Sequence, residues 1–224
     1  MLYILDTADL SAIKHCNEFY PLAGVTTNPS IIAEEKVDFW THLKAIRDTI
    51  GPEKMLHVQT VQKEAAKMIE EAKLIKGKIG GEVYIKIPIC EEGLKATKEL
   101  KKLGIGVTMT AIFTPQQALI AAMAGASFVA PYVNRLDNIL GDGSEVAAQI
   151  VNLFEIYNLD CKVLVASFKN AEQVHKCALA GCDIVTVSDE ILKALIDHPM
   201  TDAAVEGFER DWESVYGGKS ILEL

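Results

Sequence analysis

Short apolar runs alternate with amphipathic stretches along the whole chain. The runs are rich in Val, Ile and Leu, which is typical of buried β-strands. They cover Tyr3–Asp6, Ala23–Thr27, Met55–Gln59, Val83–Ile87, Gly106–Thr110, Phe128–Tyr132, Lys162–Ser167 and Ile184–Val187, eight in all. Between them, apolar residues recur with a period of about 3.6, which predicts helices. The clearest helical stretches are Gln62–Ile75, Glu91–Leu103, Pro115–Ala124 and Glu145–Tyr157.

The order of these elements predicts the fold class. Capping signals at Thr7–Asp9, Thr114-Pro115 and Ser188-Asp189 begin helices, and Gly104, Gly125 and Gly181 end them. A strand followed by a helix, repeated with apolar strands, indicates a parallel sheet covered by helices. Eight such units in a chain of this length predict an α/β fold that is a single (β/α)8 TIM barrel. A doubly wound open sheet is the alternative.

The chain shows no linker, charge block or low-complexity segment, so we expect one domain over residues 1–224. An additional C-terminal helix is predicted at about 202–216. Its apolar stripe consists of Ala204, Val205, Phe208, Trp212 and Val215, and Gly217-Gly218 ends it. A surplus amphipathic helix has to bury its stripe, either on its own barrel or on a neighbouring subunit.

Composition excludes several classes of partner. The chain has 224 residues, a net charge of −9 and a pI of about 5.1. This balance argues against nucleic acid or an anionic membrane as the main partner. Met1–Asp6 has no basic region followed by an apolar stretch, so we expect no signal peptide. No run approaches the roughly 18 apolar residues of a membrane span, and we expect a cytoplasmic protein.

Cysteine, histidine and glycine patterns give little support for a metal or a cofactor. The five cysteines include no Cys-x-x-Cys, which favours reduced, mostly packed thiols. The five histidines include no His-x-x-x-His pair, and we expect no metal site. Isolated His15, His42, His175 and His198 are expected on helical surfaces. Gly-x-Gly-x-x-Gly and Walker-type sequences are absent, so no nucleotide cofactor is indicated.

Lys86 is the most informative single residue. It lies in Val83–Ile89, an otherwise apolar run that reads as a buried strand. Burial disfavours the ammonium form and makes a neutral amine available near pH 7. A neutral amine in a pocket is the nucleophile of Schiff-base chemistry on carbonyl substrates. The alternative is a lysine that extends to solvent at a strand end or pairs with a carboxylate.

Polar residues close each of the first seven predicted strands. They are Asp6; Thr26, Thr27 and Asn28; Gln59; Lys86; Thr110; Tyr132 and Arg135; and Ser167. In barrels of this kind the active site is built at the carboxyl ends of the strands. The eight predicted strands therefore predict one ring-shaped site.

Each residue type in this ring has a possible task. Asp6 can accept hydrogen bonds from sugar hydroxyls or move protons near the amine, and Thr26 and Asn28 can bind hydroxyls. Arg135 can hold a phosphate bidentately with Ser167 as a further donor. Tyr132 can donate or relay a proton, while Gln59 and Thr110 can orient a water. Purely structural tasks, such as Asp6 capping the next helix, are the alternative for each.

Three segments resemble the transaldolase family. GVTTNPSII at Gly24–Ile32 is similar to the family signature, and Lys86-Ile87-Pro88 resembles its Schiff-base strand. Thr110–Phe113, Gln117-Ala118 and Ala124–Ala126 resemble its fifth unit. The resemblance extends over essentially the whole chain. It implies a class I aldolase-type barrel that acts on sugar phosphates without a cofactor. It also implies a homo-oligomer, a pentamer or decamer in which the C-terminal helix reaches a neighbour.

Two positions indicate a branch of that family. Classical transaldolases carry glutamate at the position of Gln59 and phenylalanine at that of Tyr132. Gln with Tyr resembles the fructose-6-phosphate aldolase branch, in which the residues matching Gln59, Thr110 and Tyr132 hold the catalytic water. By the same resemblance, Asp6, Thr26 and Asn28 surround the dihydroxyacetone part, and Arg135 and Ser167 bind phosphate. His57 departs from the branch, which has an aromatic ring there.

The resemblance therefore implies a lyase that cleaves fructose 6-phosphate to dihydroxyacetone and glyceraldehyde 3-phosphate. The first alternative is a transaldolase that passes the dihydroxyacetone unit from sedoheptulose 7-phosphate to glyceraldehyde 3-phosphate, or in the reverse direction. A second is a class I aldolase with another donor, such as a simple hydroxyketone. A third is a non-catalytic sugar-phosphate binder, because a barrel fold does not by itself imply catalysis.

Overall fold

A computed structural model describes residues 1–224 and contains a closed barrel of eight parallel strands in the order of the sequence. The strands are β1 (Leu2–Asp6), β2 (Leu22–Thr26), β3 (Met55–Gln59), β4 (Val83–Pro88), β5 (Val107–Ile112), β6 (Phe128–Pro131), β7 (Lys162–Val165) and β8 (Ile184–Val187). β1 pairs with β8 and closes the sheet. The (β/α)8 prediction is therefore confirmed, and the doubly wound alternative is wrong.

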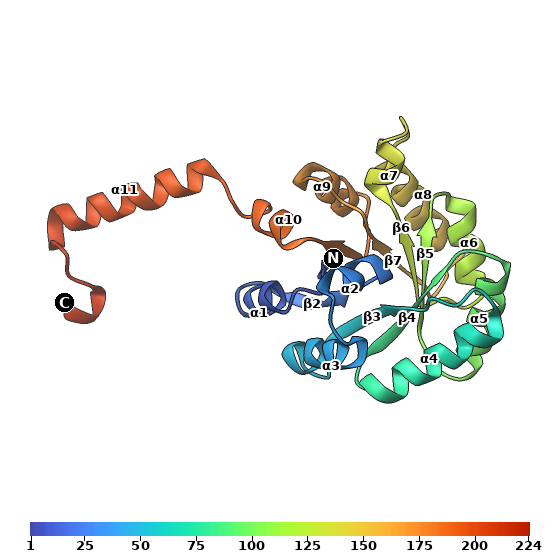
Figure 1. Cartoon of the computed structure of the whole chain (residues 1–224). Helices are drawn as coiled ribbons and strands as arrows, with labels where there is room; N and C mark the ends of the chain where they lie inside the picture. The colour runs from blue at the N-terminus through green and yellow to red at the C-terminus, as the bar shows by residue number, and fades with distance from the viewer.

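Helices fill the connections between strands, and all but the last α-helix surround the barrel (Figure 1). They are α1 (Leu10–Phe19), α2 (Pro29–Glu35), α3 (Phe39–Ile50), α4 (Ala65–Ile79), α5 (Glu91–Lys102), α6 (Pro115–Met123), α7 (Val133–Asp137), α8 (Gly143–Ile156), α9 (Ala171–Leu179), α10 (Asp189–Ala194) and α11 (Pro199–Tyr216), with a 3-10 turn at Ile221–Glu223. α4 begins three residues after the predicted Gln62. The Glu71 carboxylate accepts from the backbone N–H groups of Val61 and Gln62, at 2.9 and 3.2 Å, and holds that segment as a loop.

The predicted helix boundaries have the expected capping contacts. Asp9 accepts from the backbone N–H of Ser11 at 2.7 Å and starts α1. Thr114 and Gln117 form a reciprocal capping box at the start of α6. Gly104, Gly125 and Gly181 follow helices with φ of 69°, 101° and 81°, a left-handed region that costs glycine little.

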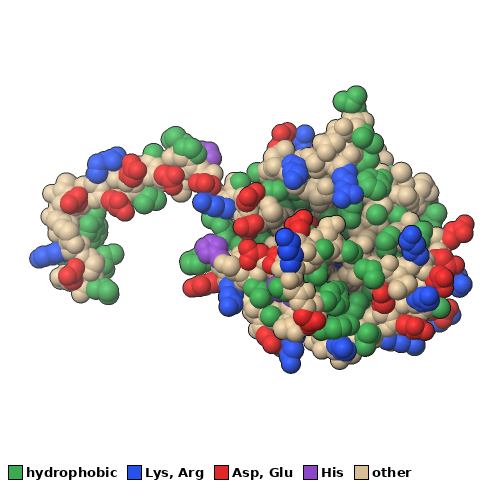
Figure 2. Space-filling model, in the orientation of Figure 1, with side chains coloured by type: hydrophobic (Ala, Val, Ile, Leu, Met, Phe, Trp, Pro, Cys, Tyr) green, Lys and Arg blue, Asp and Glu red, His purple; other side chains and the backbone are tan.

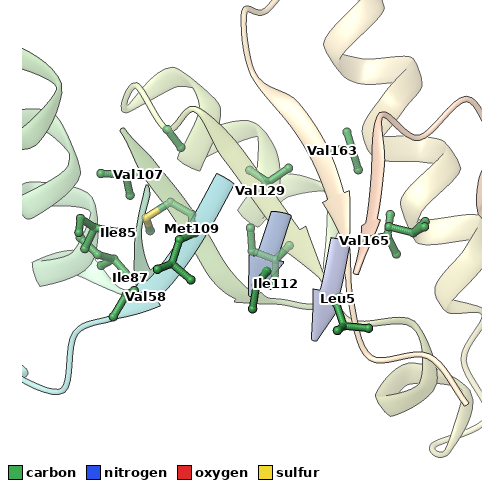
Figure 3. Close-up of a cluster of buried hydrophobic side chains, with 14 of the residues drawn as sticks. Leu5, Val58, Ile85, Ile87, Val107, Met109, Ile112, Val129, Val163 and Val165 are labelled. Carbon is green, nitrogen blue, oxygen red and sulfur yellow. The ribbon is translucent and has the colours of Figure 1, made fainter. Parts of the chain in front are cut away.

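Alternate residues of each strand face the helices and form the main core. Leu5, Val58, Ile85, Met109 and Val165 belong to this cluster, which Figure 3 shows along the barrel wall. The residues between them point into the barrel, where Ile4, Phe128, Ala130, Leu164 and Ile184 form a second, smaller cluster. Because strand periodicity is two, the same alternation places Asp6, Gln59 and Lys86 inside the barrel near its carboxyl-terminal mouth.

His42 corrects one sequence expectation. It was expected on a helical surface, but on α3 it is 7% exposed. Its Nε2 lies 2.7 Å from the carbonyl oxygen of Ala8, so its burial leaves that nitrogen satisfied. Of the five cysteines, Cys90 is exposed and the other four are buried, as expected for mostly packed thiols.

The C-terminal helix α11 leaves the barrel and extends away from it with the chain end (Figure 1). It begins at Pro199, three residues before the predicted Asp202, with the side chain of His198 accepting from the Met200 N–H at 3.1 Å. None of its residues is buried. No helix of the structure combines the length and the apolar character needed to cross a membrane.

Candidate active site

Lys86 lies inside the barrel mouth with 6% of its surface exposed. Its Nζ donates to the carbonyl oxygen of Thr27 at 2.8 Å, so its partner is a neutral backbone group and not a carboxylate. Burial lowers the pKa of this ammonium below its usual value, while the charge of Asp6 partly opposes the shift. The side chain therefore fits neither a surface lysine nor half of an ion pair. It fits a nucleophilic amine.

Asp6 joins a short chain of hydrogen bonds at the same mouth. The Thr26 hydroxyl donates to the Asp6 carboxylate at 2.6 Å and lies 2.6 Å from the hydroxyl of Thr186. Since Thr26 has one proton to give, Thr186 must be the donor to Thr26. Asp9, and not Asp6, caps the following helix. Asp6 is thus held by β2 and remains close enough to Lys86 to influence its charge.

Thr110 and Tyr132 form the opposite side of the mouth. Their hydroxyl oxygens lie 2.9 Å apart, and the Phe113 ring stands edge-on to the tyrosine ring with centroids 5.5 Å apart. Ala111, which follows Thr110, has φ of 59°, and the regular register between β5 and β6 is interrupted there. A left-handed alanine at a strand irregularity is a strained arrangement of the kind that gathers at functional sites.

Gln59 and Asn28 border the site between β2, β3 and α4. Gln59 pairs with Lys86 in the strand register, and the side-chain hydrogen bonds of this region do not include it. Asn28 caps α2 with its Oδ1, which accepts from Ser30 and Ile31, and keeps its amide N–H groups free to donate. A cavity of about 160 Å³ touches both residues. An adjoining cavity of about 300 Å³ extends from Gln59 to Phe39, Trp40, Val61, Glu71, Leu74 and Ile75.

Arg135 and Ser167 belong to neighbouring elements, which are joined by the backbone bond from Asn134 to Ser167. Arg135 is an exposed residue of α7, and its guanidinium lies 4.9 Å from the centroid of the Tyr132 ring. Ser167 follows β7 with φ of 64°, and its carbonyl oxygen accepts from the Asn134 N–H at 2.7 Å. A guanidinium at the rim, with a hydroxyl on the neighbouring loop, can bind an anionic group. The structure thus brings all the predicted site residues to one end of the barrel.

His57 lies deeper, one inward position below Gln59 on β3. It is fully buried, its ring stacks on Tyr84 with centroids 5.1 Å apart, and its Nδ1 lies 2.8 Å from the Thr108 hydroxyl. Its Nε2 has no hydrogen-bond partner in the chain. Burial, with a contribution from the charge of Lys86, lowers the pKa of His57 to about 3. The imidazole is therefore a neutral group beneath the site.

Two residues of this arrangement carry no sequence signal that identifies them. Thr186 and Thr108 are buried hydroxyls in β8 and β5, and threonine is an ordinary strand former. A cavity of about 700 Å³ lies at the opposite end of the barrel, and none of the predicted site residues lines it. No group of three or more His, Cys, Asp or Glu side chains is arranged to hold a metal ion.

Comparison with known proteins shows the family of the chain and supports its fold. The family model described as "Transaldolase/Fructose-6-phosphate aldolase" matches residues 3–218. Similar solved structures include a candidate fructose-1,6-biphosphate aldolase from Coccidioides immitis, with 19% identity, a TM-score of 0.54, and coverage of 99% of this chain and 81% of that one. A mandelate oxidase variant has 13% identity and a TM-score of 0.57, with coverage of 96% and 74%. At these identities, the two structures support the barrel fold alone.

Proposed function

Because the chain belongs to the transaldolase/fructose-6-phosphate aldolase family, we propose that it is a Schiff-base aldolase that reversibly cleaves fructose 6-phosphate. The products are dihydroxyacetone and glyceraldehyde 3-phosphate. The observation that carries this proposal is Lys86, a buried amine without a carboxylate partner at the carboxyl end of a barrel strand. Such a lysine has a lowered pKa and can attack a ketone near neutral pH.

The first half of the cycle forms an electron sink. The neutral Lys86 amine attacks the C2 ketone, and loss of water from the carbinolamine leaves an iminium. The C4 hydroxyl then loses its proton, the C3–C4 bond breaks, and its electron pair moves into the iminium to give an enamine. Glyceraldehyde 3-phosphate leaves. Asp6, held by Thr26, is placed to accept hydrogen bonds from the donor hydroxyls and to stabilise the cationic nitrogen.

Proton transfer is the task of the Thr110–Tyr132 pair. We assign a water between Thr110, Tyr132 and Gln59 to take the proton from the C4 hydroxyl and return one to C3 of the enamine. The 2.9 Å contact between the two hydroxyls orients the phenol. The amide of Gln59, beside Lys86 in the strand register, can bind the same water. Hydrolysis of the resulting iminium releases dihydroxyacetone and restores Lys86.

The far end of the substrate is assigned to Arg135 and Ser167. Arg135 is in none of the ion pairs of the chain, so its guanidinium can bind phosphate. The donor end is assigned to Thr26 and Asn28, whose free amide N–H groups can bind a hydroxyl.

Transaldol transfer is the second candidate, because it shares every step up to the enamine. In that reaction the enamine attacks a second aldose phosphate and is not protonated. Two side chains favour the lyase: Gln59 is uncharged where a glutamate could act as a base, and the Tyr132 phenol can supply the proton. A hydroxyketone donor other than dihydroxyacetone would use the same Lys86 chemistry.

The deciding experiment measures glyceraldehyde 3-phosphate release from fructose 6-phosphate with and without erythrose 4-phosphate. We expect steady release without the acceptor, since water resolves the enamine. Release only in the presence of the acceptor would identify a transaldolase instead.

Borohydride trapping tests the covalent step and separates an enzyme from a sugar-phosphate binder. We expect fructose 6-phosphate with borohydride to add one dihydroxyacetone-derived group at Lys86, measured by mass spectrometry. The Lys86→Ala variant should give neither adduct nor turnover. Full activity in that variant would end the proposal.

A further inference from the structure

The proposed phosphate site is divided between two short pieces of chain. Arg135 belongs to α7, a helix of five residues, and Ser167 belongs to the turn after β7. A helix this short is not stable by its own hydrogen bonds. The distance between the guanidinium and the serine hydroxyl therefore depends on contacts that hold α7 against the β7–α9 loop.

Backbone contacts fix only the first turn of α7. The N–H groups of Val133 and Asn134 donate to the carbonyl oxygens of Ala166 and Ser167, at 3.0 and 2.7 Å. Arg135 lies beyond them, and the chain after α7 rises from the barrel (Figure 1). A further contact is needed to hold the rest of the helix.

On the side of the β7–α9 loop, Gln173 of α9 supplies that contact. It is 8% exposed, and its Oε1 accepts from the Lys169 N–H at 2.8 Å, in the loop that carries Ser167. Its Nε2 donates to the Asp137 carboxylate at 2.6 Å and to the Asn134 side-chain oxygen at 3.3 Å. One buried amide thus joins the Ser167 loop to residues on both sides of Arg135.

The Gln173 amide also bonds to Asp137, the acidic residue nearest to Arg135 in the sequence. One oxygen of Asp137 accepts from Gln173, and the other accepts from the Gly143 N–H at 2.8 Å. Asp137 is therefore engaged by neutral donors, and Arg135 forms no ion pair. Without Gln173, the Asp137 carboxylate would become available to Arg135 and compete with phosphate.

We propose that Gln173 is the positioning residue of the phosphate site, holding Arg135 and Ser167 at their working separation and keeping Asp137 away from the guanidinium. The inference rests on the proposed function, because it takes Arg135 and Ser167 as phosphate ligands. Gln173 itself touches no substrate in this scheme. It acts on affinity for the phosphate group and not on bond cleavage.

Gln117 provides a matched control. It occupies the same third position of α6, and its Oε1 accepts from the N–H groups of Phe113 and Thr114, at 2.8 and 3.2 Å. Both of its side-chain bonds use this oxygen, and neither joins α6 to a second helix. A Gln→Glu change keeps the acceptor oxygen in both helices, but only in Gln173→Glu does it place a carboxylate against Asp137.

The test compares aldol addition of dihydroxyacetone to glyceraldehyde 3-phosphate and to glyceraldehyde. For Gln173→Glu we expect the KM for the phosphorylated aldehyde to rise about tenfold, with kcat and the KM for glyceraldehyde within about twofold of wild type. Gln117→Glu should leave both KM values unchanged. In the double variant Gln173→Glu/Asp137→Asn, the amide at position 137 donates to the carboxylate at position 173. This variant should recover most of the lost affinity for the phosphorylated aldehyde. Equal rises in both KM values, or no rise with the phosphorylated aldehyde, would overturn the inference.

Calorimetric titration with inorganic phosphate gives a readout that needs no turnover. Wild type should bind phosphate more tightly than Gln173→Glu and Arg135→Ala do. Equal phosphate affinity in wild type and Gln173→Glu would also overturn the inference. Failure of the proposed function looks different: wild type would then give no borohydride adduct with fructose 6-phosphate, whatever its affinity for phosphate.

Discussion

Lys86, the proposed nucleophile, lowers the stability of the fold through its burial. Below its lowered native pKa the folded chain buries an ammonium group, which is unfavourable. As the pH rises towards 10.5, the native amine loses its proton before the unfolded chain does, so the free energy of unfolding increases. Methionine has similar length and no charge. We expect Lys86→Met to be more stable than wild type at neutral pH. The difference in the free energy of unfolding between the two proteins should decrease as the pH rises.

Urea unfolding at about pH 6 and about pH 10 measures this difference. Exposed Lys95, which forms only a surface ion pair, offers the control: Lys95→Met should show a small difference that hardly changes with pH. A Lys86→Met variant less stable than wild type at both pH values would mean that the bond to Thr27 outweighs the burial of charge.

His57 should make the fold sensitive to acid. Its native pKa is about 3, and its usual pKa is 6.5. Between pH 3 and pH 6.5, His57 is therefore protonated in the unfolded chain and neutral in the native chain. The free energy of unfolding is therefore not reduced by His57 above pH 6.5, and it decreases as the pH falls below that value. At about 1.36 kcal/mol per pH unit, the loss reaches roughly 5 kcal/mol near pH 3. We expect His57→Phe to lack this loss.

Acid unfolding followed by circular dichroism tests the prediction, with exposed His15→Phe as the control variant. The His57→Phe midpoint should lie at lower pH than that of wild type, and the His15→Phe midpoint should not move. Coincident acid transitions for wild type and His57→Phe would show that the imidazole already takes up a proton in the folded chain.

Tyr132 should decide how the enamine is resolved. Phenylalanine keeps the ring beside Phe113 and Arg135 but removes the hydroxyl that contacts Thr110. We expect Tyr132→Phe to lower acceptor-independent cleavage by about 10²-fold, the usual scale of one proton-transfer group, and to reduce transfer much less. The ratio of glyceraldehyde 3-phosphate released without and with erythrose 4-phosphate measures this. An unchanged ratio would remove the reason for assigning Tyr132 a part in protonating the enamine. Tyr84→Phe, at the other end of the barrel, is the control and should leave the ratio unchanged.

Single residues differ in how far the sequence reveals them. Lys86 and Asp6 could be predicted because a charge in or beside an apolar strand is unusual. Thr186 and Gln173 could not. A threonine in a strand and a glutamine in a helical first turn are both common, and only the contacts at 2.6 Å to Thr26 and to Asp137 give them a task.

At the scale of elements, Gly24 shows why the motif around Thr26 begins with glycine. A Cβ on Gly24 would lie 2.1 Å from the carbonyl oxygen of Met55 on β3, which neither strand can relieve without breaking their pairing. We expect Gly24→Ala to destabilise the fold by roughly 3 kcal/mol or more, as overpacking in a core does. Thermal unfolding measures it.

Gly77 is the matched control for this prediction. It lies inside α4, and a Cβ there meets nothing within 4 Å. Gly77→Ala should therefore raise stability by about 0.5–1 kcal/mol through helix propensity alone. Equal effects of the two changes would mean that β2 and β3 can move apart freely.

The order and type of most elements followed from apolar periodicity, because barrel strands are buried on both faces and their helices are amphipathic. Boundaries depended on contacts from distant residues. Glu71 holds Val61 and Gln62 out of α4, and α7 exists because its first turn is bonded to the end of β7. Neither contact leaves a local pattern in the sequence.

At the scale of the molecule, α11 leaves apolar surface without a partner. Figure 2 shows the helix as an arm apart from the barrel, with hydrophobic side chains along it. Val205, Phe208 and Val215 are 49%, 71% and 71% exposed. A continuous apolar stripe of this kind normally marks an interface. We therefore propose that α11 docks on a neighbouring copy of the chain in a homo-oligomer, the pentamer or decamer that the family resemblance implies.

Phe208→Glu tests this assembly. Full burial of a phenylalanine contributes roughly 1.5–3 kcal/mol in each contact. A ring-shaped oligomer repeats that contact in every subunit. A charge buried there should therefore dissociate the assembly at micromolar protein concentration. Arg210→Gln changes the net charge by the same amount on the opposite face of α11, where its only ion pair is with Glu206, and should leave the assembly intact. Sedimentation velocity measures both. Because Lys86 and its partners all belong to one barrel, the dissociated Phe208→Glu variant should still form the borohydride adduct, and loss of that adduct on dissociation would show that a neighbouring subunit completes the site.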